Sequence, residues 1–279
     1  MSLLVVRVAN PDEADVASDW LWSLGAQAIE ERADEPVSLI AGFTSSEAAL
    51  AVRDVVGERW PTRFEVPPDE AEWRDVWLEH LEPVTVDRFV IHPPWRPAPS
   101  DGAHQSLSID PGRAFGSGHH PTTRLAIRLM TNTVEPGHRV LDVGCGTGVL
   151  SIVAGALGAG SVEGIDLNLG IAELARTNAE ANGLPASTVN FSDRPLSTFT
   201  DDAVGSNSDW DLVVANMTRA NTSPLMADLV RLASHHLILS GLLDSQAEEV
   251  NASITDSSDL LLVSSVSAEG WTALRFDRR

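Results

Sequence analysis

Apolar and polar residues alternate in short segments along the first 66 residues. Runs such as LLVVRVA (3–9) and VSLIAGF (37–43) have the composition of strands, whereas segments such as 11–25 and 45–60 space their apolar residues as helices do. The order of the segments is strand, helix, strand, strand, helix, strand. It predicts a small α+β domain of the ferredoxin-like type over residues 1–66.

A different pattern covers residues 67–103. Trp73, Trp77 and Leu81 recur at every fourth position and predict a helix with one apolar face. An extended stretch follows, and then the proline-rich segment RPAPSDGA (96–103). We therefore expect residues 67–103 to link two bodies, the larger of which spans residues 104–279.

Strand-like and helix-like segments alternate in this larger part of the chain. Strands are expected at 139–145, 161–167, 187–193, 211–217 and 235–241, with helical segments between them. This alternation predicts an α/β fold in which helices cover both faces of a parallel sheet. The tail LLLVSSVSAEGWTALRFD instead predicts two strands around Glu269–Gly270, which form an antiparallel pair at the sheet edge.

A glycine-rich turn, VLDVGCGTG (140–148), ends the first of these strands. Gly144, Gly146 and Gly148 lie where the strand gives way to a helix, and glycine there lets the backbone approach a ligand closely. A dinucleotide-binding fingerprint would need a third glycine at position 149, which is valine, and the chain has no lysine for a phosphate-binding P-loop. The turn therefore favours a ligand other than NAD, FAD or a nucleoside triphosphate.

Asp166 ends the next strand, 22 residues after Gly144. A carboxylate at this place can accept hydrogen bonds from both hydroxyl groups of a ribose. Together with the glycine turn it favours a nucleoside without phosphates. The alternative is that Asp166 caps a helix.

A second glycine cluster lies in DPGRAFGSGHHPTT (110–123). Its three glycines and Pro111 allow a tight fold-over, and Phe115 offers an apolar lid over a bound nucleoside. Thr122 and Thr123 can present hydroxyl groups to a ligand or cap the helix that follows. We therefore interpret this loop as a cover for the ligand of the glycine turn.

Asn216 closes the fourth expected strand and faces the same crevice. Its amide oxygen could accept a hydrogen bond from the reacting group of a substrate and orient that group, which makes Asn216 the candidate catalytic residue. The alternative is a strand-end asparagine that begins a turn.

No metal site is expected. His119 and His120 are adjacent, so their side chains point apart in extended chain, and no second cluster of ligands accompanies them. Cys145 is the only cysteine, which excludes disulfides and zinc clusters. We interpret Cys145 as a small filler in the glycine turn, because no histidine and carboxylate pair accompanies it.

The pattern D-x-G-x-G-x-G, with an acid at the end of the next strand, resembles class I S-adenosylmethionine-dependent methyltransferases. Asp142 supplies the first acid. The resemblance implies a Rossmann-like sheet with an antiparallel edge. It also implies that the turn formed by Asp142, Gly144, Gly146 and Gly148 cradles the amino-acid part of the cofactor, while Asp166 holds the ribose.

Residues 110–123 narrow the resemblance to the PrmA family, the bacterial enzymes that methylate ribosomal protein eleven of the large subunit. GIDLN, NAEANG and EGWTALRF agree with that family, and the match covers about residues 70–279. It implies S-adenosylmethionine as the cofactor, contacted by Thr123 and by Asn216. The implied reaction is methyl transfer to amines, either lysine side chains or the α-amine, with residues 1–66 recognising the substrate.

The segment NMTRANTSPL (216–225) departs from the family. Met217 and Thr218 replace the usual Ile-Leu pair, and about three additional residues precede Pro224. Because this segment lies at the expected acceptor pocket, two other functions remain open. One is methylation of another protein or of a small molecule, and the other is a non-catalytic cofactor-binding module that acts through its N-terminal domain.

Charge restricts the partners. The formal net charge is −21, and all 19 basic residues are arginine. Proteins bind nucleic acids through Lys and Arg contacts to phosphates, so we expect no direct nucleic-acid binding and instead a basic protein partner, met free rather than on the ribosome. A surface adapted for solubility or salt would explain the same charge. The sequence does not indicate an oligomeric state.

The chain has no run approaching the ~18 apolar residues of a membrane span, and its N-terminus lacks a secretory signal. We expect a cytoplasmic protein without a membrane partner.

Overall fold

The computed structural model describes residues 2–9, 11–26, 28–32, 37–43, 45–65, 81–97, 102–112, 114–168, 170–201 and 210–279. The chain forms two compact units, residues 1–80 and 81–279, each with its own hydrophobic core. The predicted helix around Trp73 and Trp77 lies outside the described residues. None of the helices in the described ranges is long and apolar enough to cross a membrane.

The first unit has the predicted element order. Its elements are β1 (Ser2–Val8), α1 (Pro11–Ser23), β2 (Ala28–Arg32), β3 (Val37–Phe43), α2 (Ser46–Val56) and β4 (Thr62–Glu65). The strands form one antiparallel sheet in the order β2-β3-β1-β4, as a ferredoxin-like unit requires. Alternate residues of β1, such as Leu4 and Val6, are buried in the core.

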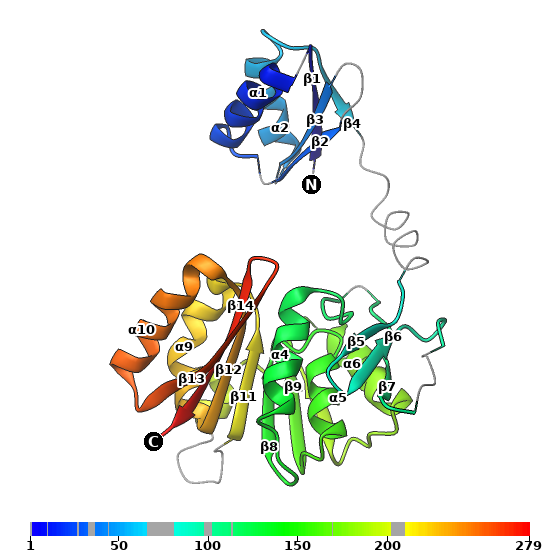
Figure 1. Ribbon diagram of the computed structural model, residues 1–279, viewed down its shortest axis with the longest axis vertical. Coiled ribbons are helices and arrows are strands. Elements are labelled where there is room, and N and C mark those ends of the chain that lie inside the picture. Colours follow the sequence, from blue (N-terminus) through cyan, green and yellow to red (C-terminus); the bar gives the residue numbers. More distant parts are fainter. Residues whose placement is uncertain are drawn as a thin grey trace. The chain divides into compact units, whose positions relative to one another are not determined.

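The second unit is built on a seven-stranded sheet (Figure 1). The parallel strands are β8 (Arg139–Val143), β9 (Ser161–Ile165), β10 (Val189–Ser192), β11 (Trp210–Asn216) and β12 (Ala233–Leu243). The hairpin of β13 (Leu260–Ala268) and β14 (Trp271–Arg278) adds the antiparallel edge in the order β10-β9-β8-β11-β12-β14-β13. The predicted α/β fold with this edge is therefore confirmed.

Helices cover both faces of this sheet because its strands are apolar on both sides (Figure 1). Val140 and Leu212 face one core, and the neighbouring Leu141 and Val213 face the other. The first core is shared with α4 (Pro121–Thr131), α5 (Val149–Ala156) and α6 (Ile171–Ala181). The second is shared with α7 (Ser197–Asp201), α9 (Met226–Leu232) and α10 (Ala247–Ser257). Three short helical segments complete the connections between β11 and β13. They are α8 (Arg219–Thr222), η1 (Ser223–Leu225) and η2 (Asp244–Gln246).

A small second sheet belongs to the same unit. It consists of β5 (Val84–Val86), β6 (Phe89–His92) and β7 (Gln105–Ser108), with β6 parallel to β7. β5 and β6 fall within the range expected as a linker, whereas the structural units divide between residues 80 and 81. Asn182, the C-cap residue of α6, binds both the amide and the carbonyl of Ser108, at 2.9 and 2.7 Å, so the end of β7 is fixed against the end of that helix.

Candidate active site

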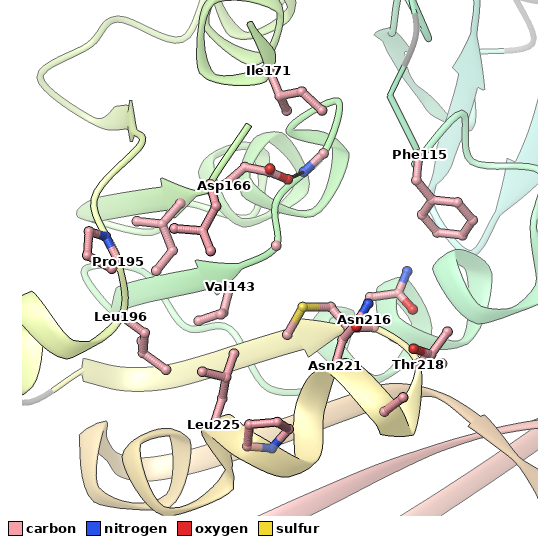
Figure 2. Close-up of a pocket in the computed structure, with 18 of the residues that line it drawn as sticks. Phe115, Val143, Asp166, Ile171, Pro195, Leu196, Asn216, Thr218, Asn221 and Leu225 are labelled. Carbon is pink, nitrogen blue, oxygen red and sulfur yellow. Dashed lines mark hydrogen bonds between the residues drawn. The ribbon is translucent and has the colours of Figure 1, made fainter. Parts of the chain in front are cut away.

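The carboxyl ends of β8, β9 and β11 surround a cavity of about 800 Å³ (Figure 2). This is the expected place, because the chain leaves the central strand β8 toward β9 on one side while β11 lies on the other. The cavity brings together five of the predicted site residues: Phe115, Gly144, Gly146, Asp166 and Asn216. The other three, Thr123, Asp142 and Gly148, do not line it and lie directly behind its wall.

The glycine turn has the backbone conformation that its sequence predicts. Gly144, Gly146 and Gly148 have φ angles of +72°, +53° and +80°, which side-chain-bearing residues rarely adopt. At Gly146 a Cβ atom would also lie 2.3 Å from the carbonyl oxygen of Phe115. Burial raises the pKa of the Cys145 thiol in this turn, which keeps the thiol protonated and agrees with a filler.

Asp166 stands at the cavity wall immediately after β9. Asp166 is labelled in Figure 2. Its Oδ2 atom accepts a hydrogen bond from the Gly146 amide at 3.2 Å, and its Oδ1 atom accepts one from the Asn168 amide at 3.0 Å. The N-cap of the next helix is Gly170, so Asp166 does not cap α6. Each carboxylate oxygen can accept a further hydrogen bond, and the carboxylate is held in place to do so.

Asn216 ends β11 on the opposite side of β8. Its Nδ2 atom donates to the hydroxyl oxygen of Thr123 at 3.3 Å, and Thr123 is itself fully buried in the first turn of α4. Within the described part of the chain, no group donates to the buried Oδ1 atom of Asn216. The site therefore contains a fixed amide oxygen with an unused acceptor position.

Asp142 lies beneath the glycine turn and is 1% exposed. Its Oδ2 atom accepts hydrogen bonds from the Ser151 amide and hydroxyl at 3.0 and 2.7 Å, which ties β8 to α5. Burial raises its pKa to about 6 against the effect of these hydrogen bonds, and the charge of Asp166 adds to the rise. Asp142 thus supports the turn from behind.

An aromatic wall bounds the cavity on the side of α4. The His120 ring packs edge-on against Phe115 and Trp271, with ring centroids 5.2 and 5.1 Å apart. Phe115 is 54% exposed and lies across the cavity from Pro195 and Leu196 in Figure 2. Trp271 comes from the start of β14, so the antiparallel edge contributes directly to the site.

The helix cap of α4 differs from the prediction. His120, and neither Thr122 nor Thr123, is the N-cap residue, and its Nδ1 atom accepts a hydrogen bond from the Thr122 amide at 3.3 Å. The helix begins at Pro121, which places both threonines inside the first turn. Burial and the charge of Arg124 lower the pKa of His120, which favours the neutral ring that a cap needs.

The two adjacent histidines contact different partners. The Nε2 atom of His119 lies 2.6 Å from the carbonyl oxygen of Glu82, while the His120 ring lies in the aromatic wall. Across the ranges that the structure describes, no group of three or more His, Cys, Asp or Glu residues is placed to hold a metal ion.

Two features of the site were missed by sequence reasoning. Leu167 directly follows Asp166, is 75% exposed and faces the cavity, where Leu196 and Ile171 complete an apolar slot. The signal in the sequence was a large apolar residue directly after Asp166. Thr147, inside the glycine turn, was the second omission, and only tertiary contacts reveal its role.

The segment 216–225 forms the rim of the cavity beside Asn216. Met217, Thr218 and Asn221 line the cavity in the turn that leads into α8. Arg219 turns away and pairs with Glu249 of α10. These residues therefore shape the part of the cavity beside the end of β11, whereas Gly144 and Asp166 line it at the ends of β8 and β9.

Comparison with known proteins agrees with this geometry. A family model described as "Ribosomal protein L11 methyltransferase (PrmA)" matches residues 11–279. The ribosomal protein L11 methyltransferase of Ralstonia pickettii is 39% identical over 97% of this chain and 96% of that protein. The enzyme of the same name from Cupriavidus taiwanensis is 35% identical over 98% of each chain.

A solved structure supports the same conclusion. The ribosomal protein L11 methylase of Lactobacillus delbrueckii subsp. bulgaricus is 26% identical with a TM-score of 0.61, over 71% of this chain and 99% of that chain. The predicted family and the predicted S-adenosylmethionine cofactor are confirmed. The chain belongs to the PrmA family of ribosomal protein L11 methyltransferases and is an S-adenosylmethionine-dependent methyltransferase.

Proposed function

We propose that this enzyme methylates amine nitrogens of ribosomal protein L11, on lysine side chains or at the α-amine. The observation that carries the proposal is the amide of Asn216, whose oxygen is held next to the glycine turn with no hydrogen-bond donor among the described residues. An amine has an N–H to donate to this oxygen. A carboxylate acceptor, which has no hydrogen to donate, would leave it unpaired at a cost.

The cofactor position follows from the same walls. Asp166 accepts hydrogen bonds from the ribose hydroxyls, and the apolar slot of Leu167, Ile171 and Leu196 takes the adenine. The turn of Gly144 and Gly146 receives the amino-acid part, supported from behind by Asp142 and Gly148. Thr123 does not touch the cofactor and acts through Asn216, whose amide its hydroxyl group orients.

The main task of the protein in this reaction is to orient the attacking nitrogen toward the methyl group of the cofactor. S-adenosylmethionine supplies a methyl group on a sulfonium, which is already activated, so no covalent enzyme intermediate is needed. Asn216 aligns the attacking nitrogen, and the aromatic wall excludes water from the acceptor side. Lysine has a pKa near 10.4 in water, so desolvation in the cavity favours the neutral amine that attacks.

The first unit is proposed to recognise the protein substrate. On α1, Trp20 and Trp22 are 40% and 51% exposed, and Val16 precedes Trp20 by one helical turn. Exposed tryptophans are typical of protein interfaces. The excess of 21 negative charges attracts a basic ribosomal protein and repels ribosomal RNA, so the substrate is met free in the cytoplasm.

Intact-mass measurement of purified L11 incubated with enzyme and S-adenosylmethionine tests the reaction. We expect mass increases in steps of one methyl group. Asn216→Ala should lose about a hundredfold in rate, while Asn216→Asp, which retains an acceptor oxygen, loses less. Methylation of hydroxyl or carboxylate groups, or equal rates in Asn216→Ala and wild type, would contradict the proposal.

The state of the substrate is tested separately. Turnover should be faster on free L11 than on intact large subunits, and the preference should weaken as salt screens the charges. A preference for intact subunits would oppose the proposal.

One observation favours a second candidate, methylation of a different acceptor. The rim at Met217, Thr218 and Asn221 departs from the family and lines the acceptor side of the cavity. A panel of basic proteins and small amines, assayed beside L11, separates the two candidates. Tight cofactor binding without transfer to any acceptor would instead indicate a non-catalytic module.

A further inference from the structure

Thr147, in the middle of the glycine turn, is bonded to the loop that covers the cavity. Its amide donates to the Phe115 carbonyl at 3.0 Å, and its hydroxyl donates to the Gly116 carbonyl at 2.7 Å. The side chain is fully buried. Two consecutive carbonyl groups of the covering loop are thus held by one residue of the cofactor turn.

The third polar group of Thr147 is bonded to the start of the same loop through Asn178. The Nδ2 atom of Asn178 donates to the carbonyls of Thr147 and Asp110, both at 2.9 Å. Its Oδ1 atom accepts from the Asp110 amide at 2.9 Å. Asn178 is buried, so its bond to the Thr147 carbonyl is shielded from water, while its two bonds to Asp110 are partly buried.

The approach between the two segments is close enough to require glycine on both sides. A Cβ atom at Gly116 would lie 2.7 Å from the Thr147 hydroxyl, and one at Gly146 would lie 2.3 Å from the Phe115 carbonyl oxygen. Both residues also have positive φ angles. The contact is therefore a built interface between two glycine-rich segments that are 31 residues apart at the Gly116–Thr147 bond.

We propose that Thr147 is a positioning residue that holds Phe115 over the cavity, so that the cofactor wall and the aromatic acceptor wall form one preassembled body. The inference goes beyond the proposed acceptor and depends only on cofactor binding and methyl transfer. A loop that is already ordered costs no ordering entropy when the cofactor binds. Losing the bonds of Thr147 releases Phe115 and weakens binding, although Thr147 does not line the cavity.

The first test replaces the hydroxyl group alone. Thr147→Val keeps the shape and removes the bond to Gly116, and Thr147→Ser restores the hydroxyl. We expect the Kd for S-adenosylmethionine, measured by calorimetry, to rise about tenfold in Thr147→Val and to stay within about twofold of wild type in Thr147→Ser. Hydrogen exchange of peptides covering residues 110–118 should accelerate in the valine variant only.

Asn182, the C-cap residue of α6, supplies a matched control for Asn178. Asn182 lies one turn after Asn178 and makes the same kind of bonds, to the amide and carbonyl of Ser108 and to the Asn178 carbonyl. None of these bonds reaches the glycine turn. Asn178→Ala should raise the Kd and the KM for the cofactor about tenfold or more, whereas Asn182→Ala should lower Tm comparably with less than about a twofold change in Kd.

Equal cofactor affinities for Asn178→Ala and Asn182→Ala, or wild-type affinity in Thr147→Val, would overturn the proposal. So would unchanged hydrogen exchange of residues 110–118 in Thr147→Val. Calorimetry needs no methyl acceptor, so this test gives its answer even if the enzyme fails to methylate L11. The calorimetric result therefore tests the role of Thr147 separately from the proposal that L11 is the methyl acceptor.

Discussion

At the residue scale, the contribution of the buried Asp142 carboxylate to folding stability depends strongly on pH. Its pKa of about 6 in the folded protein lies above the ordinary value of 3.8, so the folded state binds more protons between these values. Stability from this group is greatest below about pH 4 and is lost as the pH rises through 6. The charge is retained because Ser151 donates two hydrogen bonds to it and links β8 to α5.

Asp142→Asn is expected to remove this dependence. Relative to wild type, the free energy of unfolding of the variant should increase by about 2 kcal/mol between pH 4 and pH 8. Urea denaturation of both proteins across this range measures the difference, from which other titrating groups cancel. A constant difference between the two proteins would show that Asp142 does not titrate there.

Gly146→Ala should be among the most damaging single substitutions. The new Cβ atom would lie 2.3 Å from the Phe115 carbonyl oxygen, at a residue with a φ of +53°. We expect a loss of about 2 kcal/mol or more in stability and a large rise in the Kd for S-adenosylmethionine. Gly170→Ala is the control, since no heavy atom lies within 4 Å of its Cβ position, and it should match wild type in Tm and Kd.

The sequence predicted those site residues whose role depends on local backbone geometry. The spacing of Gly144 and Gly146 and the strand-end positions of Asp166 and Asn216 led to the cavity wall. The role of Thr147 could not be predicted, because its partners at Phe115 and Gly116 are distant in sequence. The capping role of His120 was assigned to the neighbouring threonines because histidine is not a usual cap.

At the scale of elements, the β13–β14 hairpin contributes chemistry as well as a sheet edge. Its turn at Glu269 and Gly270 has positive φ angles, and Glu269 pairs with Arg124 of α4 at 2.6 Å. This ion pair connects the hairpin to the helix that carries His120 at its cap. Trp271 is thereby placed against the His120 ring at the cavity.

Trp271→Ala should separate acceptor turnover from cofactor binding. The substitution removes the Trp271 ring from the wall of the proposed acceptor side and leaves Phe115, Asp166 and the glycine turn in place, so kcat should fall about tenfold or more while the Kd for S-adenosylmethionine stays within about twofold. Steady-state kinetics and calorimetry measure the two quantities. Trp95→Ala, an exposed tryptophan that does not line the cavity, is the control. A rise in the Kd equal to the fall in kcat would contradict this division.

Most elements of the second unit could be predicted because alternation and helical spacing are strong in a two-faced sheet. β11, expected at 211–217, spans Trp210–Asn216, and the terminal hairpin turns at Glu269–Gly270 as expected. The pairing of β6 with β7 was not predicted, since apolar alternation does not identify a strand's partner. For that reason residues 84–92 were expected to be part of a linker.

At the scale of the whole molecule, the cavity belongs to one unit. Every residue that lines the cavity lies between Phe115 and Trp271, within residues 81–279. That unit also has two hydrophobic cores of its own. The first unit is left with the proposed task of holding the protein substrate.

A chain of residues 81–279 should therefore bind S-adenosylmethionine with the affinity of the full protein, within about twofold. Its KM for L11 should rise about tenfold or more, because the docking surface on α1 is lost. Calorimetry and mass-based kinetics measure the two values. An unchanged KM would show that the first unit does not recognise the substrate.

This separation has a practical consequence. If the leading 80 residues were exchanged for a module that recognises another basic protein, the methyl group would be delivered to a new target while the catalytic body stayed as it is. Specificity in such a chimera would come from tethering, since a captured target is present at high effective concentration beside the cavity. The fold would then serve as a transferable tool for marking chosen proteins.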